Sequence, residues 1–354
     1  MKTETLIVGQ GLAGSVLANA LQALHRDFLV LDNPLLSSSS KIAAGIWNPV
    51  VFKRMTLSWM AKQALTSMHN FYSNTEHNHQ SHYFFSKKLL KFFTEEQEAV
   101  LWMKKNKTEL KDLVEEKIYS PDEFNYHGLQ KPKFGFSYVT ESGFLDCSYF
   151  INTTRDQLIK SGQFVVSKKD KDGFQINSKG FILNDIECEK VIFCEGWLAS
   201  NNSFFDFIPF KPAKGELLFF ESEELQLDVI LNKGIFILPV GGKLFVCGAT
   251  YEWNTLNDRI TEEKQSFLEV KLKELISCPY KVLNRKAGVR PSVIDRRPVI
   301  GEHPRYKNLY IFNGFGTKSV LLAPYFSKIL LDSVFKNQKI TDEVNVARFI
   351  NHLA

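Results

Sequence analysis

The sequence has little cysteine and no long apolar run. Five cysteines are scattered among 354 residues, and no two of them form a CxxC pair. This pattern argues against a disulfide scaffold and a cysteine-based zinc site, and it favours free thiols in a reducing compartment. No apolar run approaches the roughly 18 residues of a membrane-spanning helix. The chain opens directly on an apolar strand pattern without the parts of a signal peptide, so we expect a cytoplasmic protein.

Strong charge of one sign is also missing. Lys and Arg number 44 and Asp and Glu 39, which gives a net charge of +5. The one local basic cluster, within residues 104–111, is typical of a solvated helix face, and no basic stripe indicates nucleic-acid binding. The histidines at positions 77, 79 and 82 lack an acid-rich surrounding. We therefore expect a solvated loop there and no metal site.

What the sequence does contain is an ordinary globular composition. Hydrophobic residues make up 44%, with 30 phenylalanines among them, which allows a large, partly aromatic core. The length predicts about two domains, and the lack of repeats or long linkers predicts that they interleave. Apolar patterns predict strands at 5–8, 28–31, 191–194 and 309–312. They predict helices at 12–24, 56–73, 94–117, 145–160, 259–276 and 320–335. We also expect a polar loop at 74–81 and a β-hairpin at 163–183 around Asp172-Gly173.

A glycine motif between the first strand and the first helix gives the first functional inference. Gly9, Gly11 and Gly14 form a GxGxxG pattern. The first glycine allows a tight turn, the second lets a pyrophosphate approach the backbone, and the third lets the helix pack on the sheet. Leu12 and Ala13 then begin the helix, whose N–H groups and dipole favour phosphate. In this context the motif predicts a dinucleotide site rather than a glycine-rich turn without a ligand.

An acidic residue completes the pattern. Asp32 ends the second strand, where its carboxylate can accept hydrogen bonds from ribose hydroxyls, and Asn33 follows it. The alternative is an ordinary aspartate that starts a loop. The motif does not by itself choose between NAD and FAD. Its place at the start of the chain, with matching strands near residues 190 and 310, favours FAD.

Four segments of the chain carry a family resemblance. They are residues 9–14 (GQGLAG), 43–46 (AAGI), 214–217 (KGEL), and a spaced series at 287–291, 297–301, 314–316 and 322–324. In these segments the chain resembles the D-amino-acid oxidase (DAO) family of FAD-dependent oxidoreductases, glycine oxidase-like members above all. The resemblance runs from end to end and is weak at about 60–140.

The resemblance implies an α/β fold in two parts. One is a Rossmann-like FAD-binding domain built from discontinuous segments, residues 1–84, 139–207 and 286–354. The other is an α+β substrate domain with a mostly antiparallel sheet, residues 85–138 and 208–285. In the family the segment that resembles 214–217 is the turn into the substrate domain.

The resemblance also implies catalytic residues. Arg290 matches the arginine that binds the substrate carboxylate, and guanidinium holds a carboxylate bidentately; the alternative is a structural salt bridge between the domains. Phe236 stands where relatives often have tyrosine, so one donor is missing. Lys318 would stabilise reduced flavin near its N1/C2 carbonyl, unless it is a solvated lysine at a helix start. The residues expected to bind FAD are Gly9, Gly11, Leu12, Ala13, Gly14, Asp32, Asn33, Ala43, Ala44, Gly45, Gly196, Trp197, Gly314, Phe315, Gly316, Thr317 and Lys318.

Two further expectations concern the flavin and its surroundings. No Cys or His lies between residues 313 and 324, where some relatives attach flavin covalently, so we expect non-covalent FAD. Trp47, Phe236 and Phe315 would line an aromatic pocket, with ordinary core packing as the alternative for each of them.

The resemblance predicts oxidation of a C–N bond in a small-molecule amine or amino acid. The substrate would give a hydride to flavin N5, and the imine would hydrolyse in water. Two alternatives stay open. One is tRNA-base modification by flavin-driven C–N cleavage, although nucleic acid is not the partner the charge favours. The other is a flavin-binding protein without turnover.

Overall fold

The first βαβ unit folds as the sequence predicts. The structure is a computed structural model that describes residues 1–167, 174–177, 180–183 and 185–352. The unit consists of β1 (Lys2–Val8), α1 (Leu12–Ala23) and β2 (Phe28–Asp32). Its two strands pair in parallel with Val8 opposite Leu31, and Ile7, Val16 and Val30 are fully buried in one core.

These strands belong to a mostly parallel sheet. Its other strands are β10 (Phe164–Val166), β11 (Gln175–Asn177), β12 (Gly180–Leu183), β13 (Ile186–Phe193), β19 (Val299–Glu302) and β20 (Leu309–Asn313). Strands β10, β2, β1, β13 and β20 run parallel in that order. Strand β19 pairs antiparallel with β20, and the β11–β12 hairpin pairs antiparallel with the start of β13. The pairs β1–β13, β2–β10 and β13–β20 therefore join distant parts of the sequence.

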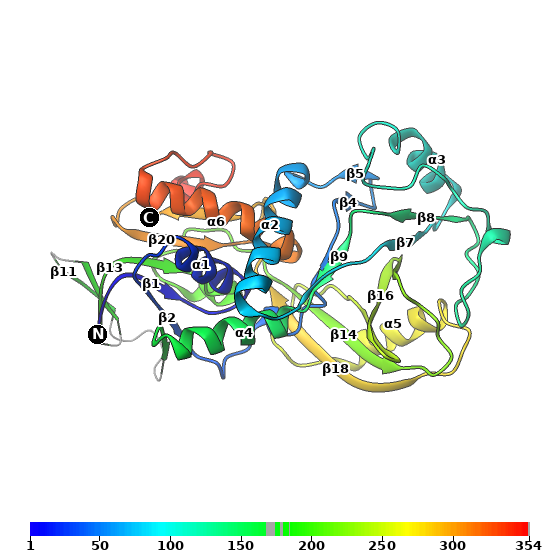
Figure 1. The fold of residues 1–354 in the computed structure, drawn as a ribbon, viewed down its shortest axis with the longest axis horizontal. Coiled ribbons are helices and arrows are strands. Elements are labelled where there is room, and N and C mark those ends of the chain that lie inside the picture. Colours follow the sequence, from blue (N-terminus) through cyan, green and yellow to red (C-terminus); the bar gives the residue numbers. More distant parts are fainter. Residues whose placement is uncertain (168–173, 178–179, 184, 353–354) are drawn as a thin grey trace.

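Helices cover one face of this sheet. They are α1, α4 (Cys147–Lys160) and α6 (Ser319–Lys336), and α2 (Ala61–His79) packs on α6 and α4. Helix α6 lies against both α1 and α2, and α4 lies against α1 (Figure 1). Side chains alternate along the strands, so Ile7 and Ile192 join the core under the helices while Leu6 and Val191 join a second core on the other face.

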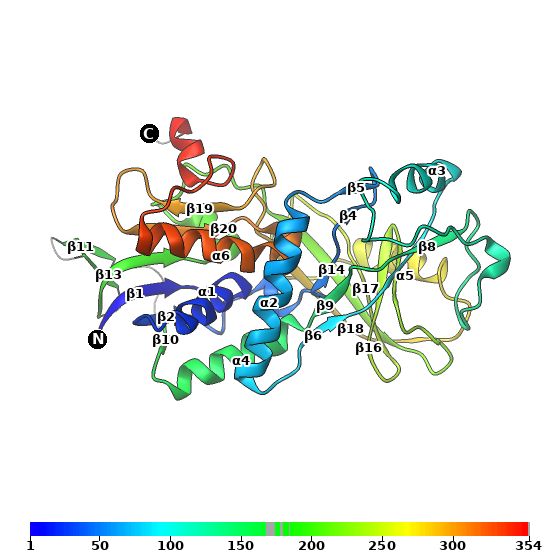
Figure 2. The same cartoon turned by 45° about the horizontal axis from the view of Figure 1, so that its top comes forward.

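A second sheet lies beside the first, on the right of Figures 1 and 2. Its strands in order are β18 (Lys281–Arg290), β14 (Ala213–Glu221), β17 (Leu244–Gly248), β16 (Ile235–Gly241), β15 (Ile230–Lys233), β7 (Leu89–Phe92) and β8 (Phe136–Val139). All neighbours pair antiparallel except β15 and β7. Helix α5 (Glu262–Lys273) covers one face through Leu268 and Leu272, which leaves the other face turned toward the first sheet.

Short elements complete the described chain. The strands are β3 (Ile46–Trp47), β9 (Gly143–Leu145) and β6 (Phe84–Ser86) in one small sheet, and β4 (Val50–Val51) with β5 (Thr56–Leu57) in another. The helices are α3 (Glu96–Lys105) and the 3₁₀ helices η1 (Ser39–Lys41), η2 (Pro121–Glu123), η3 (Gly196–Asn201), η4 (Gly316–Lys318) and η5 (Val346–His352). Within the described ranges, no helix is long and apolar enough to cross a membrane.

Several element predictions were wrong in position. The polar loop expected at 74–81 is mostly the end of α2, because Thr75 and His79 are buried and keep the helix packed. The charged helix expected at 94–117 ends at Lys105, and the side-chain amide of the buried Asn106 donates to the carbonyl of Glu116 just after it. Tertiary packing overrides local pattern in both places.

The predicted β-hairpin at 163–183 also differs. Its first part, β10, pairs in parallel with β2, and the hairpin that the structure has is β11–β12. The turn expected at Asp172-Gly173 lies outside the described residues. The segment 214–217 is not a turn but the interior of β14, where Gly215 pairs with Gly288 of β18.

The second sheet draws on residues 89–92, 136–139 and 213–290. Strands β8 and β18 cross two of the expected domain boundaries, at 138 and 285. The exact division of the chain into two domains stays a prediction.

Candidate functional site

A cavity of about 1040 Å³ extends along the carboxyl ends of the parallel strands to the open face of the second sheet. Val8, Asp32 and Cys194, which end or follow β1, β2 and β13, line it from the first sheet. Leu217 and Phe236 line it from the second. Ligands of open parallel sheets bind at this edge, and the volume is at the upper end of ordinary ligand pockets, which reach about 1,000 Å³.

The three glycines occupy the positions that their motif requires. Gly9 has a φ of +99°, and its N–H donates to the carbonyl of Leu31 at 2.8 Å. Gly11 is the N-cap of α1, with no side-chain cap. A Cβ on Gly14 would collide with the carbonyl of Gly9, so Gly14 serves helix packing and does not line the cavity. Gly9, Gly11, Leu12 and Ala13 do line it.

A serine-rich segment closes over the start of α1. The N–H of Leu12 donates to Ser40 Oγ at 3.1 Å, and a Cβ on Gly11 would lie 3.2 Å from the same oxygen. A Cβ on Gly288 of β18 would lie 3.2 Å from Ser39 Cα, so the segment also touches the second sheet. No motif in the sequence pointed to this segment.

Asp32 lies at the cavity wall with two partners. Its Oδ1 accepts from the N–H of Gln10 at 3.0 Å and its Oδ2 from Arg155 Nη2 at 3.4 Å. Asn33 lines the cavity beside it, as does Lys41. Burial and the charge of Arg155 lower the pKa of Lys41. Arg155 comes from α4, so no local signal in the sequence pointed to it.

Another part of the wall consists of backbone and one indole. Ala43, Ala44, Gly45 and Gly196 line the cavity. Trp197 lines it too, and its Nε1–H is buried without a hydrogen-bond partner in the described structure. An orphaned buried donor at a cavity wall indicates a ligand acceptor, because leaving it unpaired costs about 1–3 kcal/mol.

The segment before α6 brings a cation to the cavity. Phe315, Gly316, Thr317 and Lys318 line it, whereas Gly314, with a φ of +79°, lies behind the wall. Lys318 Nζ donates to the carbonyl of Asn48 at 2.9 Å. Burial lowers the pKa of Lys318 to about 8. No acidic side chain of the described residues forms an ion pair with it. Its partial burial and its hydrogen bond to Asn48 argue against the alternative of a solvated lysine at a helix start.

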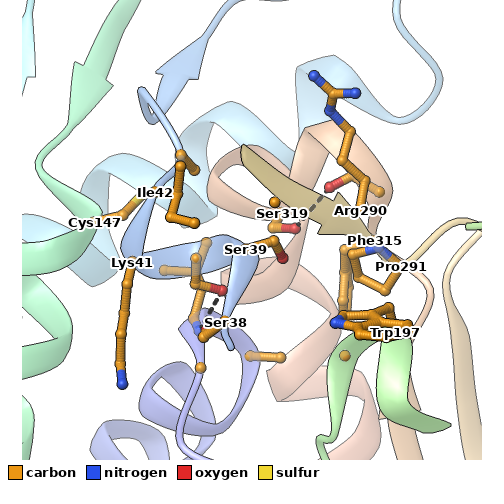
Figure 3. A pocket seen from close by; sticks show the side chains of 18 of the residues that line it. Ser38, Ser39, Lys41, Ile42, Cys147, Trp197, Arg290, Pro291, Phe315 and Ser319 are labelled. Atoms are coloured by element: carbon orange, nitrogen blue, oxygen red, sulfur yellow. Dashed lines mark hydrogen bonds between the residues drawn. The ribbon is translucent and has the colours of Figure 1, made fainter. Parts of the chain in front are cut away.

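Arg290 ends β18 at the cavity. Figure 3 shows Arg290 and Trp197 on one side of the pocket with Phe315 between them, and Lys41 across from them. Arg290 Nη1 donates to the carbonyls of Lys214 and Thr250 at 3.3 and 3.2 Å. Burial lowers its pKa, and none of the described carboxylates pairs with it. The structural salt bridge considered for Arg290 is therefore absent among the described residues.

The predicted aromatic pocket is only partly correct. Phe236 and Phe315 line the cavity. Trp47 does not; it is 1% exposed and packs between His69 and Phe84, with ring centroids 5.1 and 5.4 Å away. Trp47 therefore belongs to the core.

The histidine group shows no sign of a metal centre. His82 Nδ1 lies 2.9 Å from Glu76, and His79 Nδ1 lies 3.1 Å from the hydroxyl of Tyr83. No group of three or more His, Cys, Asp or Glu side chains in the described ranges could hold a metal ion.

A parallel sheet whose glycine turn opens into a large cavity at the carboxyl ends of its strands is the architecture of a dinucleotide-binding domain. The chain belongs to the DAO family, described as FAD dependent oxidoreductase, whose family model matches residues 4–333. The predicted family, fold class and FAD cofactor are confirmed.

Known relatives agree with this assignment. The chain is 23% identical over 397 aligned residues to the tRNA 5-methylaminomethyl-2-thiouridine biosynthesis bifunctional protein of Legionella pneumophila, and the match covers 98% of this chain and 57% of that protein. The chain thus spans little more than half of that relative. Among solved structures, glycine oxidase from Geobacillus kaustophilus is 20% identical with a TM-score of 0.79, covering 98% of both chains. L-proline dehydrogenase from P. horikoshii is 16% identical with a TM-score of 0.78, covering 99% and 98%.

Proposed function

We propose that this chain binds FAD non-covalently in the cavity and oxidises a C–N bond of a small amine or amino acid that carries a carboxylate. The observation that carries this proposal is Arg290, a partly buried cation at the cavity without an acidic partner among the described residues. A buried charge is normally paired, so a carboxylate brought by the substrate would complete the site.

The residues fit the cofactor at both ends. Gly11 and the start of α1 offer close backbone approach and a positive helix end to the pyrophosphate. The carboxylate of Asp32 would accept from the ribose, which makes it more than a loop-starting residue. The orphaned Nε1–H of Trp197 would find an acceptor. Bound FAD supplies the two-electron oxidation itself.

The chain's own residues would bind and orient the substrate. Arg290 holds the carboxylate through its free guanidinium edge and thereby fixes the direction of the Cα–H bond. Phe236 and Phe315 exclude water around the reacting amine. Lys318, charged below a pH of about 8, places a positive charge at the wall of the cavity. The imine product is released to water, where it hydrolyses.

An absorbance spectrum of the purified protein, followed by anaerobic addition of amines, tests the proposal. The panel contains glycine, sarcosine, D-amino acids, proline and carboxymethylaminomethyluridine. We expect a flavin spectrum that bleaches with a carboxylate-bearing amine and stays unchanged with the same amine after esterification of its carboxylate. A protein that holds no flavin after reconstitution would contradict the proposal.

Two other functions stay candidates. The match of 98% of this chain to a bifunctional tRNA-modification protein favours action on a tRNA base; salt-dependent tRNA binding would support it. A flavin that no amine reduces would instead favour a non-catalytic role. We also propose a cytoplasmic setting, because all five cysteines are free and four of them are buried.

A further inference from the structure

A buried ion pair lies on the far side of β14 from the cavity. Lys214 and Glu216 are 1% and 0% exposed, and the charged atoms of their side chains lie 3.5 Å apart. Gly215, between them, faces the other way: it lines the cavity, and a Cβ there would collide with the guanidinium of Arg290. Because side chains alternate along a strand, one face of β14 holds the guanidinium and the opposite face holds the ion pair.

The pair ties the connection from β17 to α5 onto β14. Residues 249–261 of this connection form no helix or strand. The backbone of Lys214 pairs with that of Glu252 through N–H···O bonds of 2.8 and 3.0 Å, and Lys214 Nζ donates to Asn257 Oδ1 at 3.2 Å. Long connections without regular structure are usually either functional or disordered. This one is held by a single lysine at its start and in its middle.

Glu216 holds both ends of the same connection. Its Oε1 accepts from the N–H and the hydroxyl of Thr261 at 3.0 and 2.9 Å, and its Oε2 accepts from Gln265 Nε2 at 2.7 Å. Thr261 is the N-cap of α5 and makes no side-chain cap bond, so its hydroxyl serves the carboxylate and not the helix. At the other end, the N–H of Glu216 donates to Thr250 Oγ1 at 2.9 Å.

These contacts meet at the two carbonyls that hold Arg290. Arg290 Nη1 donates to the carbonyl of Lys214 at 3.3 Å and to that of Thr250 at 3.2 Å. The first carbonyl belongs to a member of the ion pair, and the second belongs to a residue bound by the other member. Tyr251, next in the chain, places its ring 4.4 Å from the guanidinium carbon. A shift of the connection along β14 would therefore separate the two carbonyls and turn the guanidinium.

Stability alone gives little reason for such a pair. Both charges lose their hydration on burial, and replacing a buried ion pair by apolar residues of similar volume is often neutral or stabilising. We propose that Lys214 and Glu216 are positioning residues, which set the angle at which Arg290 presents its free edge to a carboxylate. This inference rests on the proposed function, because it requires that Arg290 bind the substrate.

Binding of (methylthio)acetate to the FAD-loaded full chain measures this positioning without turnover, because the thioether carboxylate lacks the C–N bond. Binding is followed by the change in flavin absorbance. The test variant combines Lys214→Met with Glu216→Gln, which removes both charges and keeps side chains of similar size. We expect its Kd for (methylthio)acetate to rise about fivefold to fiftyfold, since a misplacement of about 1 Å can cost about a hundredfold in a reacting site. Its Kd for FAD, from fluorescence titration, should stay unchanged.

Arg290→Lys shows whether the effect passes through the guanidinium. Lysine keeps the charge but lacks the planar fork that the two carbonyls hold. In an Arg290→Lys background, removal of the ion pair should change the Kd by less than about twofold, because the coupling is lost with the residue that carries it. An ion pair that only supports the general shape of the cavity would raise the Kd by the same factor in both backgrounds.

Two further variants complete the comparison. Thr261→Val removes one donor to Glu216 and keeps both charges, so we expect a smaller rise in Kd, of about twofold to fivefold. It provides the test even if the doubly substituted protein does not fold. Lys190→Met with Glu4→Gln is the control, because this pair, 3.2 Å apart between β13 and β1, lies outside the cavity lining. It should leave the Kd unchanged.

Two results would overturn the inference while sparing the proposed function. One is an unchanged Kd in whichever of the Lys214→Met/Glu216→Gln and Thr261→Val proteins fold. The other is an equal rise in Kd with arginine or lysine at position 290. The proposed function is judged separately with the ion pair intact. No binding of (methylthio)acetate, or equal binding in Arg290→Ala, would remove the carboxylate site and this inference with it.

Discussion

Replacing Arg290 by alanine separates a substrate-binding arginine from a structural one. The guanidinium keeps one edge on two carbonyls, and its Nη2 and Nε form no hydrogen bond to any described residue. That free edge is what a carboxylate would occupy. Truncating one partner of a buried, hydrogen-bonded charge pair costs about 2–5 kcal/mol. This corresponds to a fall in kcat/KM of roughly 30-fold to 5,000-fold for a carboxylate-bearing substrate.

The same substitution should hardly change stability. Losing a partner from a buried ion pair destabilises by about 3–5 kcal/mol, but Arg290 has no such pair among the described residues. Two hydrogen bonds are lost and a costly buried charge is removed, so we expect the free energy of unfolding to change by no more than about 1 kcal/mol. Steady-state kinetics and urea titration of the FAD-loaded protein measure the two effects.

Arg285→Ala is the matched control on the same strand. Arg285 pairs with Glu269 at 2.6 Å on the surface, away from the cavity, and surface pairs contribute only about 0–1 kcal/mol. Kinetics should stay unchanged in this variant. The reasoning about Arg290 is refuted if Arg290→Ala keeps its kcat/KM, or if it loses 3–5 kcal/mol of stability, the amount expected of a structural ion pair.

Three further predictions concern other residues of the site. Burial lowers the pKa of Lys318 from 10.5 to about 8, so between these pH values the folded protein binds fewer protons at this residue than the unfolded chain. The free energy of unfolding should therefore rise with pH across this window, by no more than about 3 kcal/mol. Urea titrations of Lys318→Met should lack this rise. Gly11→Ala should weaken FAD binding, measured by fluorescence titration, and leave the fold intact. Gly14→Ala should lower the free energy of unfolding by about 1–3 kcal/mol, because the added Cβ would collide with the backbone carbonyl of Gly9. Phe236→Tyr adds a hydroxyl donor to the cavity wall and should lower the Kd of (methylthio)acetate by about threefold to tenfold; an unchanged Kd would mean that Phe236 does not face the carboxylate.

The parts of the fold that the sequence predicted are those encoded by contiguous residues. The opening βαβ unit needs only an apolar run, three glycines and a helical stripe within its first 32 residues, and it folded as expected. The Gly–Phe–Gly segment before α6 likewise lies where its neighbouring strand predicts. Local pattern suffices there because each element's partner is the next element in the chain.

The unpredicted contacts join residues far apart in the sequence. Arg155 reaches Asp32 across 123 positions, and Lys318 reaches the carbonyl of Asn48 across 270. Such pairs depend on how α4 packs on α1 and how the end of the chain returns to the first sheet, and no periodicity encodes either. The prediction for Trp47 was wrong for a similar reason, because the sequence pattern around an aromatic residue is the same whether its ring packs in a core or lines a cavity.

The register of the second sheet places a mostly apolar row of residues on its cavity face. Four residues lie directly opposite one another across β14, β17, β16 and β15: Leu217, Gly248, Phe236 and Asn232. Their side-chain positions therefore share one face of the sheet. All four residues line the cavity. Three of the four offer no polar group. The Asn232 amide stands at one end of this row, and Arg290 lies on the neighbouring strand β18 opposite Ala213. Under the proposed function, the polar groups that orient an amine would therefore lie outside the apolar part of the row. A phenylalanine at 236 is consistent with that division, because it adds no polar group to the middle of the row.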